Sequence, residues 1–185
     1  LTQLTVACTW IIAVYILNNL LYNAWLKHAV ILDILSISMG FILRTLMGIY
    51  AISETPTLWI LVCVFFGAMF LSFAKRRSEL RQLNDPKAFR PILQAYTLEY
   101  LTMATFVCAG LSMISYSLFV VLSGKHPAMI VTLPCVAYGI FYYLHVCLSQ
   151  NEGDEPEKVF VRHLPLLATV GLWFCLVIAI YYWFV

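Results

Sequence analysis

Long apolar runs separated by short polar segments dominate the 185-residue sequence. About 20 consecutive apolar residues suffice to cross the hydrocarbon core of a bilayer as an α-helix. Six runs have the length expected of transmembrane helices, at residues 4–26, 30–52, 58–74, 92–122, 128–148 and 164–185. Because lipid cannot satisfy open backbone groups, and the runs lack the alternation of barrel strands, the pattern predicts an all-α, polytopic membrane bundle of about six spans.

The composition supports a membrane protein. Hydrophobic residues make up 63% of the chain and charged residues only 11%, with a mean hydropathy of +0.89. A soluble domain has about 25% charged residues, so this chain has too few to cover a water-facing surface. The sequence shows no clear internal repeat, and we expect residues 1–185 to form a single domain.

Basic residues gather on one side of the predicted membrane. Threading the six spans places nine of them on that side, Lys27, Lys75, Arg76, Arg77, Arg81, Lys87, Arg90, Lys158 and Arg162. The opposite side has only Lys125, and Arg44 falls within a span. An excess of Lys and Arg favours the cytosolic side, so we expect this face in the cytosol and both ends of the chain on the outer side. Because the basic residues follow the membrane, nothing indicates nucleic-acid binding.

The cysteine and histidine patterns do not indicate a metal or disulfide site. The six cysteines lie in apolar runs without a CxxC pair, so we interpret them as small buried or lipid-facing side chains. The four histidines form no HxxxH or HExxH pair, and no phosphate-binding glycine motif occurs. The acidic segment 152–157 could bind a cation, although a solvated linker is the commoner role of such a loop.

Two ionisable residues, Asp33 and Arg44, fall inside the second predicted span. They are eleven residues apart, about three helical turns, so they share a face with Ile37 and Gly40. A charge within a span is costly and usually faces a cavity or a partner. Gly40 would allow another backbone or a ligand to approach closely. The alternative is that Asp33 lies near the interface and is hydrated.

The segment after the third span, residues 75–85, carries a dense group of charges. If the helix continues past the membrane, Lys75, Arg76 and Glu79 lie on one face. Guanidinium and ammonium groups suit phosphate, and Glu79 could help to hold a Mg²⁺ ion that bridges phosphates. A basic loop that sets topology and contacts anionic lipid explains the same pattern equally well.

Several motifs, in their order along the chain, resemble the UbiA superfamily of membrane prenyltransferases. Residues 22–28 (YNAWLKH), Asp33 and 40–44 (GFILR) are similar to the signature of its fourth and fifth helices. The remaining motifs are most similar to the decaprenyl-phosphate phosphoribosyltransferase branch, namely 74–81 (AKRRSELR, "GKRxxEL"), 96–101 (YTLEYL, "YTxxYL") and 155–157 with 162–167 (EPE and RHLPLL, "PE…RDRPLL"). The resemblance covers nearly the whole chain.

This resemblance implies a nine-helix enzyme around a cavity open to the cytosol and to the membrane. It would transfer 5-phosphoribose from phosphoribosyl pyrophosphate to a polyprenyl phosphate, such as decaprenyl phosphate, with Mg²⁺ as cofactor in a bacterial plasma membrane. The polyanionic donor would need a basic mouth, and the lipid acceptor an opening between helices. Electrostatic clamping of the leaving pyrophosphate would supply much of the catalysis. A homo-oligomer is compatible with the family.

The resemblance also implies roles for individual residues. Lys75 and Glu79 would be catalytic, with Glu79 serving the metal or the sugar. The substrate-binding residues would be Tyr22, Lys27, Asp33, Arg44, Arg76 and Arg81. Among these the basic residues would grip phosphates, while Tyr22 and Arg44 would line the cavity.

The chain departs from the family pattern in three respects. The Asp-rich motif NDxxDxxxD, the principal Mg²⁺–pyrophosphate site between the second and third family helices, is absent. The first span matches the fourth family helix and the sequence starts at Leu1, so we expect three preceding helices to be missing and the chain alone to be incomplete. Tyr142 stands where the pattern has Arg, and His163 where it has Asp.

Two other functions are compatible with the sequence. A prenyltransferase that uses a prenyl pyrophosphate donor would have a carboxylate pair in the segment 75–90, where Glu79 and Asp85 lie six residues apart. A non-catalytic membrane protein, such as a piece of a transporter or the product of a decayed gene, would have no Asp-rich motif upstream.

Overall fold

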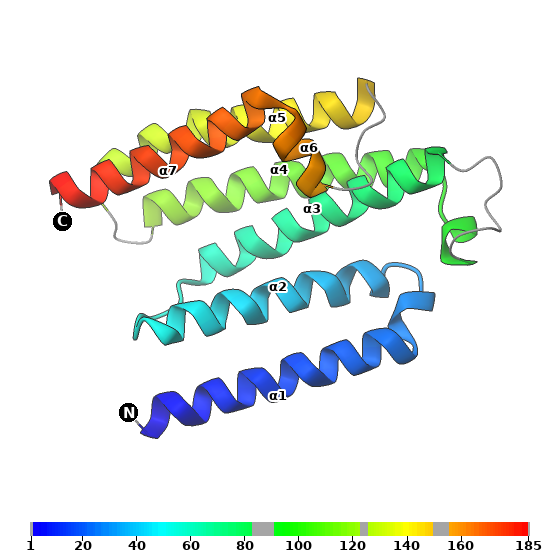
Figure 1. The fold of residues 1–185 in the computed structure, drawn as a ribbon, viewed down its shortest axis with the longest axis horizontal. Coiled ribbons are helices and arrows are strands. Elements are labelled where there is room, and N and C mark those ends of the chain that lie inside the picture. Colours follow the sequence, from blue (N-terminus) through cyan, green and yellow to red (C-terminus); the bar gives the residue numbers. More distant parts are fainter. Residues whose placement is uncertain (1, 83–90, 123–125, 150–155, 185) are drawn as a thin grey trace.

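The computed structural model describes residues 2–82, 91–122, 126–149 and 156–184, and these form a bundle of helices (Figure 1). The α-helices are α1 (Thr2–Ala24), α2 (Leu32–Ala51), α3 (Leu58–Gln82), α4 (Leu98–Leu122), α5 (Leu133–Ser149), α6 (Pro156–Arg162) and α7 (Leu164–Phe184). Three short 3₁₀ segments connect them, η1 (Leu26–His28), η3 (Pro91–Ala95) and η4 (Pro127–Thr132). These ranges contain no strand, which confirms the predicted all-α class.

Five helices are long and apolar enough to cross a membrane, over Leu32–Ala51, Leu58–Arg81, Leu98–Leu122, Pro127–Ser149 and Leu164–Trp183. α1 contains a further apolar segment, Cys8–Ala24. The predicted membrane bundle is therefore confirmed, with five spans of full length in the described residues and α1 packed beside α2.

Three boundaries differ from the prediction. α3 continues beyond Ala74 to Gln82, because the polar residues that follow are mostly strong helix formers. The fourth span begins only with α4 at Leu98, because η3 and a short interruption precede it, and there the Thr97 hydroxyl accepts a hydrogen bond from the Tyr100 N–H at 3.2 Å. Part of the segment expected to be a loop forms α6, which begins at Pro156, a residue favoured at the first position of a helix.

Helices α1 to α4 lie side by side in chain order, and α5 packs with α7 along the other side of the bundle (Figure 1). Both chain ends lie at one end of the bundle, whereas η1, η3 and the C-terminal end of α3 lie at the other. We call this second end the basic end, because Lys27 lies in η1 and the C-terminal part of α3 carries Lys75, Arg76, Arg77 and Arg81. Its assignment to the cytosol stays a prediction. Lys87, Arg90, Asp85, Lys125 and residues 152–155 lie outside the described residues.

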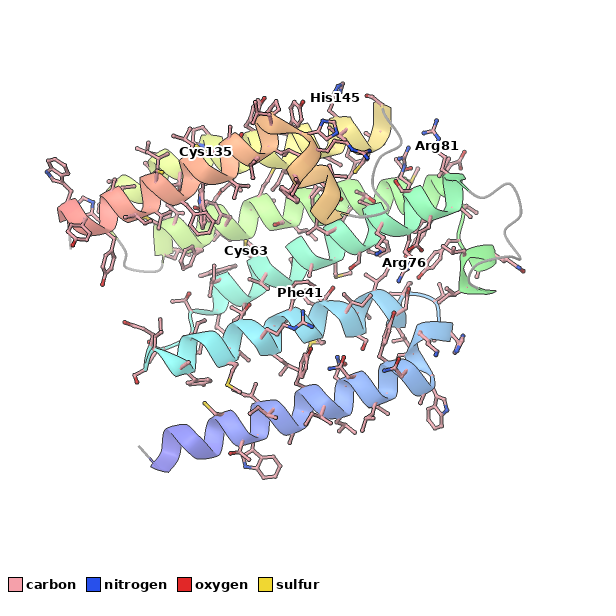
Figure 2. The ribbon with its side chains drawn as sticks, viewed as in Figure 1. Phe41, Cys63, Arg76, Arg81, Cys135 and His145 are labelled. Carbon is pink, nitrogen blue, oxygen red and sulfur yellow. The ribbon has the colours of Figure 1, made fainter. Side chains whose placement is uncertain are left out.

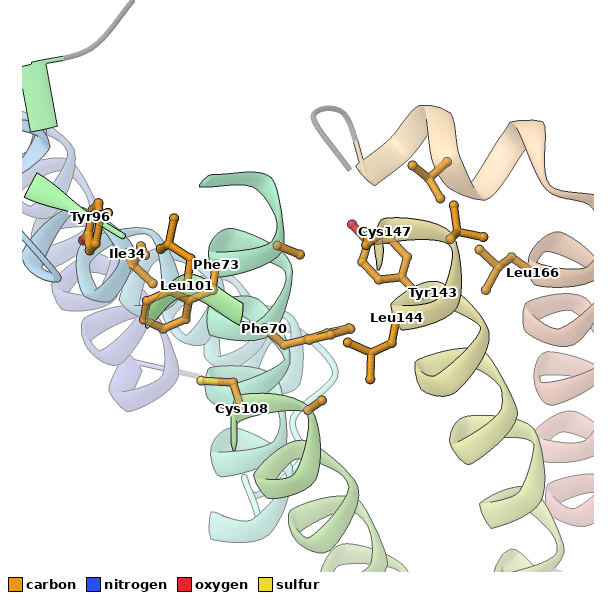
Figure 3. Close-up of a cluster of buried hydrophobic side chains, with 14 of the residues drawn as sticks. Ile34, Phe70, Phe73, Tyr96, Leu101, Cys108, Tyr143, Leu144, Cys147 and Leu166 are labelled. Atoms are coloured by element: carbon orange, nitrogen blue, oxygen red, sulfur yellow. The ribbon is translucent and has the colours of Figure 1, made fainter. Parts of the chain in front are cut away.

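The buried core links both parts of the bundle. Ile34, Phe73 and Leu101 pack between α2, α3 and α4, while Tyr143 and Leu166 belong to the α5–α7 side (Figure 3). The two parts meet where the rings of Phe70 and Tyr143 contact each other edge to face, with centroids 5.3 Å apart. All six cysteines are free, in agreement with their interpretation as small apolar side chains, and Cys108 and Cys147 are buried in this core.

Arg77 connects three helices at the basic end. The residue is 6% exposed. Its Nε donates to the Thr102 hydroxyl of α4 at 2.9 Å, and its Nη1 donates to the Cys147 carbonyl of α5 at 2.9 Å. That carbonyl is among the last four of α5, which have no partner within the helix and favour a cation. Arg77, counted in the sequence only as a basic residue that sets topology, therefore anchors α5 to α3 and α4.

We expect Arg77→Ala to lower the free energy of unfolding by about 2–3 kcal/mol, because it removes two hydrogen bonds from a charged donor. Reversible unfolding in mixed micelles, followed by circular dichroism, measures the change. The control is Arg81→Ala, which removes an exposed guanidinium from the same helix and should change stability little. Equal stabilities for the two variants would show that Arg77 does not anchor α5.

Candidate functional site

A buried polar network joins α2, α3 and η3 at the basic end. Arg76 donates from Nε to Asp33 Oδ2 at 3.0 Å and from Nη1 to Glu79 Oε2 at 2.8 Å. The Tyr96 hydroxyl donates to Asp33 Oδ1 at 3.2 Å. We call these four residues the Asp33–Arg76 network. Asp33 is 0% exposed and Arg76 is 2% exposed, so the alternative of a hydrated Asp33 at the interface does not apply.

The start of α2 positions Asp33. Ile31, the residue before the helix, has a φ of 68°, a left-handed conformation that is unfavourable for a β-branched residue. Its N–H donates to the Tyr96 hydroxyl at 2.6 Å, which helps to hold this conformation. Asp33 then lies in the first turn of α2, where the helix dipole favours a carboxylate. Local backbone geometry and the helix dipole thus both direct Asp33 into the network.

Tyr96 is a proton donor to Asp33 at neutral pH. Burial is the main cause that raises the pKa of Tyr96, to about 12, and the Asp33 carboxylate also raises it, while the hydrogen bond from Ile31 acts in the opposite direction. The hydroxyl therefore stays protonated, accepts from the Ile31 N–H and donates to Asp33. Tyr96 was noted in the sequence only as part of a motif, and its role depends on a contact between residues 63 positions apart.

The cations of the basic end differ in their availability. Arg76 is committed to two carboxylates and lies between α3 and α2, whereas Arg81 extends away from the bundle (Figure 2). Lys27 in η1 and Lys75 in α3 are partly exposed. None of Lys27, Lys75 and Arg81 forms an ion pair with another described residue. These three cations are therefore available to an anionic ligand, whereas Arg76 is held by Asp33 and Glu79.

Tyr22 and Arg44 line a groove between α1 and α2. The cavity there has a volume of about 140 Å³, and Ile37 and Gly40 also line it. The predicted shared face of Ile37, Gly40 and Arg44 is confirmed. Asp33 does not join them, because its ion pair with Arg76 turns the carboxylate toward α3. At 1.5 Å per residue, Asp33 and Arg44 are also roughly 16 Å apart along α2.

The described residues contain no group of three or more His, Cys, Asp or Glu side chains that could hold a metal ion. Within the network, both carboxylate oxygens of Asp33 accept hydrogen bonds. Glu79 uses only Oε2, for Arg76, and its side chain is 19% exposed. Since Mg²⁺ bound with substrate phosphates often has one or two protein carboxylates, Glu79 is the residue of the network that fits such an ion.

The two departures from the family pattern meet in space. The rings of Tyr142 in α5 and His163, between α6 and α7, are in edge contact with centroids 6.2 Å apart. The family pattern that the sequence resembles has Arg and Asp at these positions, and this chain has an aromatic pair there. The two positions are 21 residues apart, so the pairing cannot be inferred from local spacing.

The chain is similar in sequence to known proteins. The model of the UbiA prenyltransferase family matches residues 1–166. Decaprenyl-phosphate phosphoribosyltransferase of Corynebacterium glutamicum is 29% identical over 95% of this chain and 55% of that protein. The protein of that name from Mycolicibacterium smegmatis is 33% identical over 63% of this chain and 37% of that protein. The one from Mycobacterium tuberculosis is 25% identical over 91% of this chain and 59% of that protein. The matches thus cover between 37% and 59% of the lengths of these relatives.

The buried ion pair should show strong coupling in a double-mutant cycle. We expect Asp33→Ala to destabilise the protein by about 3–5 kcal/mol, because it leaves the buried Arg76 with only Glu79. The double variant Asp33→Ala with Arg76→Ala should lose less than the sum of the single variants, by about 1 kcal/mol or more. Unfolding in mixed micelles measures all three, and additive losses would contradict the network.

The aromatic pair should be exchangeable for an ion pair. Tyr142→Arg and His163→Asp should each destabilise the protein, because each leaves a new charge without its partner. The double variant should be more stable than either single variant by about 1 kcal/mol. Thermal unfolding of the four proteins, the wild type included, in detergent tests this. A double variant less stable than both single variants would disprove the exchange.

Proposed function

The chain belongs to the UbiA prenyltransferase family, and on this premise we propose that it transfers 5-phosphoribose from phosphoribosyl pyrophosphate to a polyprenyl phosphate. The observation that carries the proposal is the extension of α3 past the apolar span. This extension places Lys75 and Arg81, both available for a ligand, beside the Arg76–Glu79 ion pair. The relatives named above carry the name of this activity.

The basic end suits a soluble polyanion. Phosphoribosyl pyrophosphate carries phosphate groups at both ends of its ribose, and Lys27, Lys75 and Arg81 offer ammonium and guanidinium donors at one end of the bundle. Arg76 is held by Asp33 and so fixes the position of Glu79 rather than moving with the ligand. Fixed charges aimed at a leaving group lower the barrier more than mobile ones, because they need no reorganisation during the reaction.

The transfer balances without a redox step. A phosphate oxygen of the lipid attacks C1 of the ribose, the bond from C1 to the pyrophosphate oxygen breaks, and pyrophosphate leaves. Enzymes of the family generally depend on a divalent metal, and we propose Mg²⁺ with Glu79 as one of its ligands. When bound, the ion would neutralise charge on the pyrophosphate. Lys75 and Arg81 would bind the same charge directly.

The basic end would face the cytosol of a bacterial cell, where the donor is dissolved. The cations of η1 and of the end of α3 support this orientation, because Lys and Arg accumulate in cytosolic loops. The lipid acceptor would approach from the side of the bundle. Its reacting phosphate and the donor would then enter the protein from different phases.

A transfer assay tests the proposal. Membranes that contain the protein expressed from its own gene receive ribose-labelled phosphoribosyl pyrophosphate, decaprenyl phosphate and Mg²⁺. We expect label to enter the lipid fraction. A parallel reaction supplies labelled prenyl pyrophosphate and an aromatic acceptor, since the family description names prenyl transfer. Labelled product in the second reaction alone would replace the proposed donor by a prenyl pyrophosphate.

One lysine variant and one arginine variant distinguish a residue that would bind the donor directly from one that would act through its neighbours. Loss of a charge-assisted hydrogen bond costs about 1.5–3 kcal/mol, so Lys75→Ala should raise KM for phosphoribosyl pyrophosphate about tenfold or more. Its stability should be unchanged, because Lys75 has no ion-pair partner among the described residues. Arg76→Ala should lower both activity and stability. Wild-type kinetics in both variants would exclude this segment from donor binding.

A further inference from the structure

The groove between α1 and α2 has two chambers that differ in polarity. One, of about 190 Å³, is apolar apart from its boundary residues and is lined by Ile11, Ile12, Leu43 and Met47. The other, of about 140 Å³, lies nearer the basic end and its polar lining includes Asn18, Asn19, Tyr22 and Ser36. Tyr15 and Arg44 line both chambers and mark their boundary. A ligand that fills the groove must therefore have an apolar part and a polar part.

Arg44 stands at this boundary without a carboxylate partner. Its Nη2 and Nε donate to the Tyr15 hydroxyl at 2.7 and 3.2 Å, and its guanidinium lies 5.3 Å from the ring centroids of Tyr15 and Phe41. Asp33 and Glu79 both pair with Arg76 instead. A charge within a membrane span normally faces a partner or a substrate path. We therefore expect Arg44 to bind an anion from outside the described residues.

The other polar groups of the groove are largely occupied by each other. Asn18 donates to the Ser36 carbonyl at 3.0 Å and accepts from the Ser36 hydroxyl at 2.9 Å. Asn19 donates to the Tyr15 carbonyl at 3.0 Å. Arg44 is thus the strongest available donor of the groove, and the free side of its guanidinium suits the paired oxygens of a phosphate.

The depth of Arg44 limits which phosphate can reach it. Arg44 is the thirteenth residue of α2, which places its Cα roughly 18 Å from the start of the helix and roughly 10 Å from its end, inside the span. Phospholipid headgroups lie at the interface, and two acyl chains on one glycerol do not fit the single apolar chamber. A phosphate on one flexible chain can enter the groove, with the chain in the apolar chamber and the phosphate directed toward the basic end.

We propose that this groove binds the acceptor, a single-chain polyprenyl phosphate, with its phosphate on Arg44 and its first isoprene units between Ile11, Ile12, Leu43 and Met47. This inference rests on the proposed function and specifies the acceptor subsite. The donor would bind at the basic end, and the two substrates would meet in the polar chamber lined by Tyr22. The Tyr15 hydroxyl positions the guanidinium at the boundary.

Binding in nanodiscs tests this subsite without requiring catalysis. Tritiated decaprenyl phosphate is titrated onto the wild type and Arg44→Gln, and we expect the variant to bind at least tenfold more weakly. Tritiated decaprenol, which lacks the phosphate, should bind both proteins within twofold of each other. The matched control is Arg162→Gln on α6, which removes the same charge away from the groove and should bind decaprenyl phosphate like the wild type.

Three outcomes would overturn the inference: equal binding of decaprenyl phosphate to the wild type and Arg44→Gln, an equal loss in Arg162→Gln, or full competition by dioleoyl phosphatidic acid at equal mole fraction. Should Arg44→Gln not fold, Arg44→Lys keeps the charge but loses the fork, and binding should weaken at least threefold. Failure of the transfer assay with a normal Arg44 effect on binding would refute the proposed function but not the lipid site.

Discussion

The ion pair between Asp33 and Arg76 fixes how α2 meets α3 at the basic end. Lipid tails are as apolar as the helices, so the hydrophobic effect does not drive helices together within a membrane. Packing and polar contacts between helices must therefore hold a membrane bundle together. A buried pair is stable only when its remaining hydrogen-bonding capacity is used. Tyr96 and Glu79 meet this requirement, and Tyr96 also holds the strained Ile31 at the start of α2. The position of Glu79, and with it the proposed donor site, depends on this network.

Neighbouring arginines on α3 serve different partners because successive residues of a helix point about 100° apart. Arg76 faces α2 and its carboxylate, whereas Arg77 faces α4 and the carbonyl end of α5. One turn of α3 therefore fastens the helices on both of its sides. Only Lys75 and Arg81 in this cluster keep their charges available. In the sequence all four residues look equally suited to bind phosphate. In the structure, Arg76 and Arg77 hold helices together, and Lys75 and Arg81 form a candidate binding surface.

Sequence reasoning succeeds where contacts are local. Hydropathy predicts the spans, and helical periodicity predicts that Ile37, Gly40 and Arg44 share a face and that Arg76 lies near Glu79. It does not find the partner of Asp33, because Arg76 is 43 residues away and Tyr96 is 63 residues away. Sequence reasoning misses the contact between Tyr142 and His163 for the same reason, because the two residues lie far apart along the chain and each departure is judged separately. The roles of the site residues themselves stay predictions.

The charges inside the bundle lie at two depths, and this separation constrains any reaction there. The Asp33–Arg76 network closes the basic end, while Arg44 lies roughly 16 Å further along α2 with uncommitted donors. A single small anion cannot contact both levels. Two substrates can contact both levels if one enters from water and the other from lipid. Their reacting atoms would meet in the polar chamber between the levels, which is lined by Tyr22 and Ser36. The separation of charges by depth thus favours a transfer between a soluble donor and a lipid acceptor over binding of either one alone.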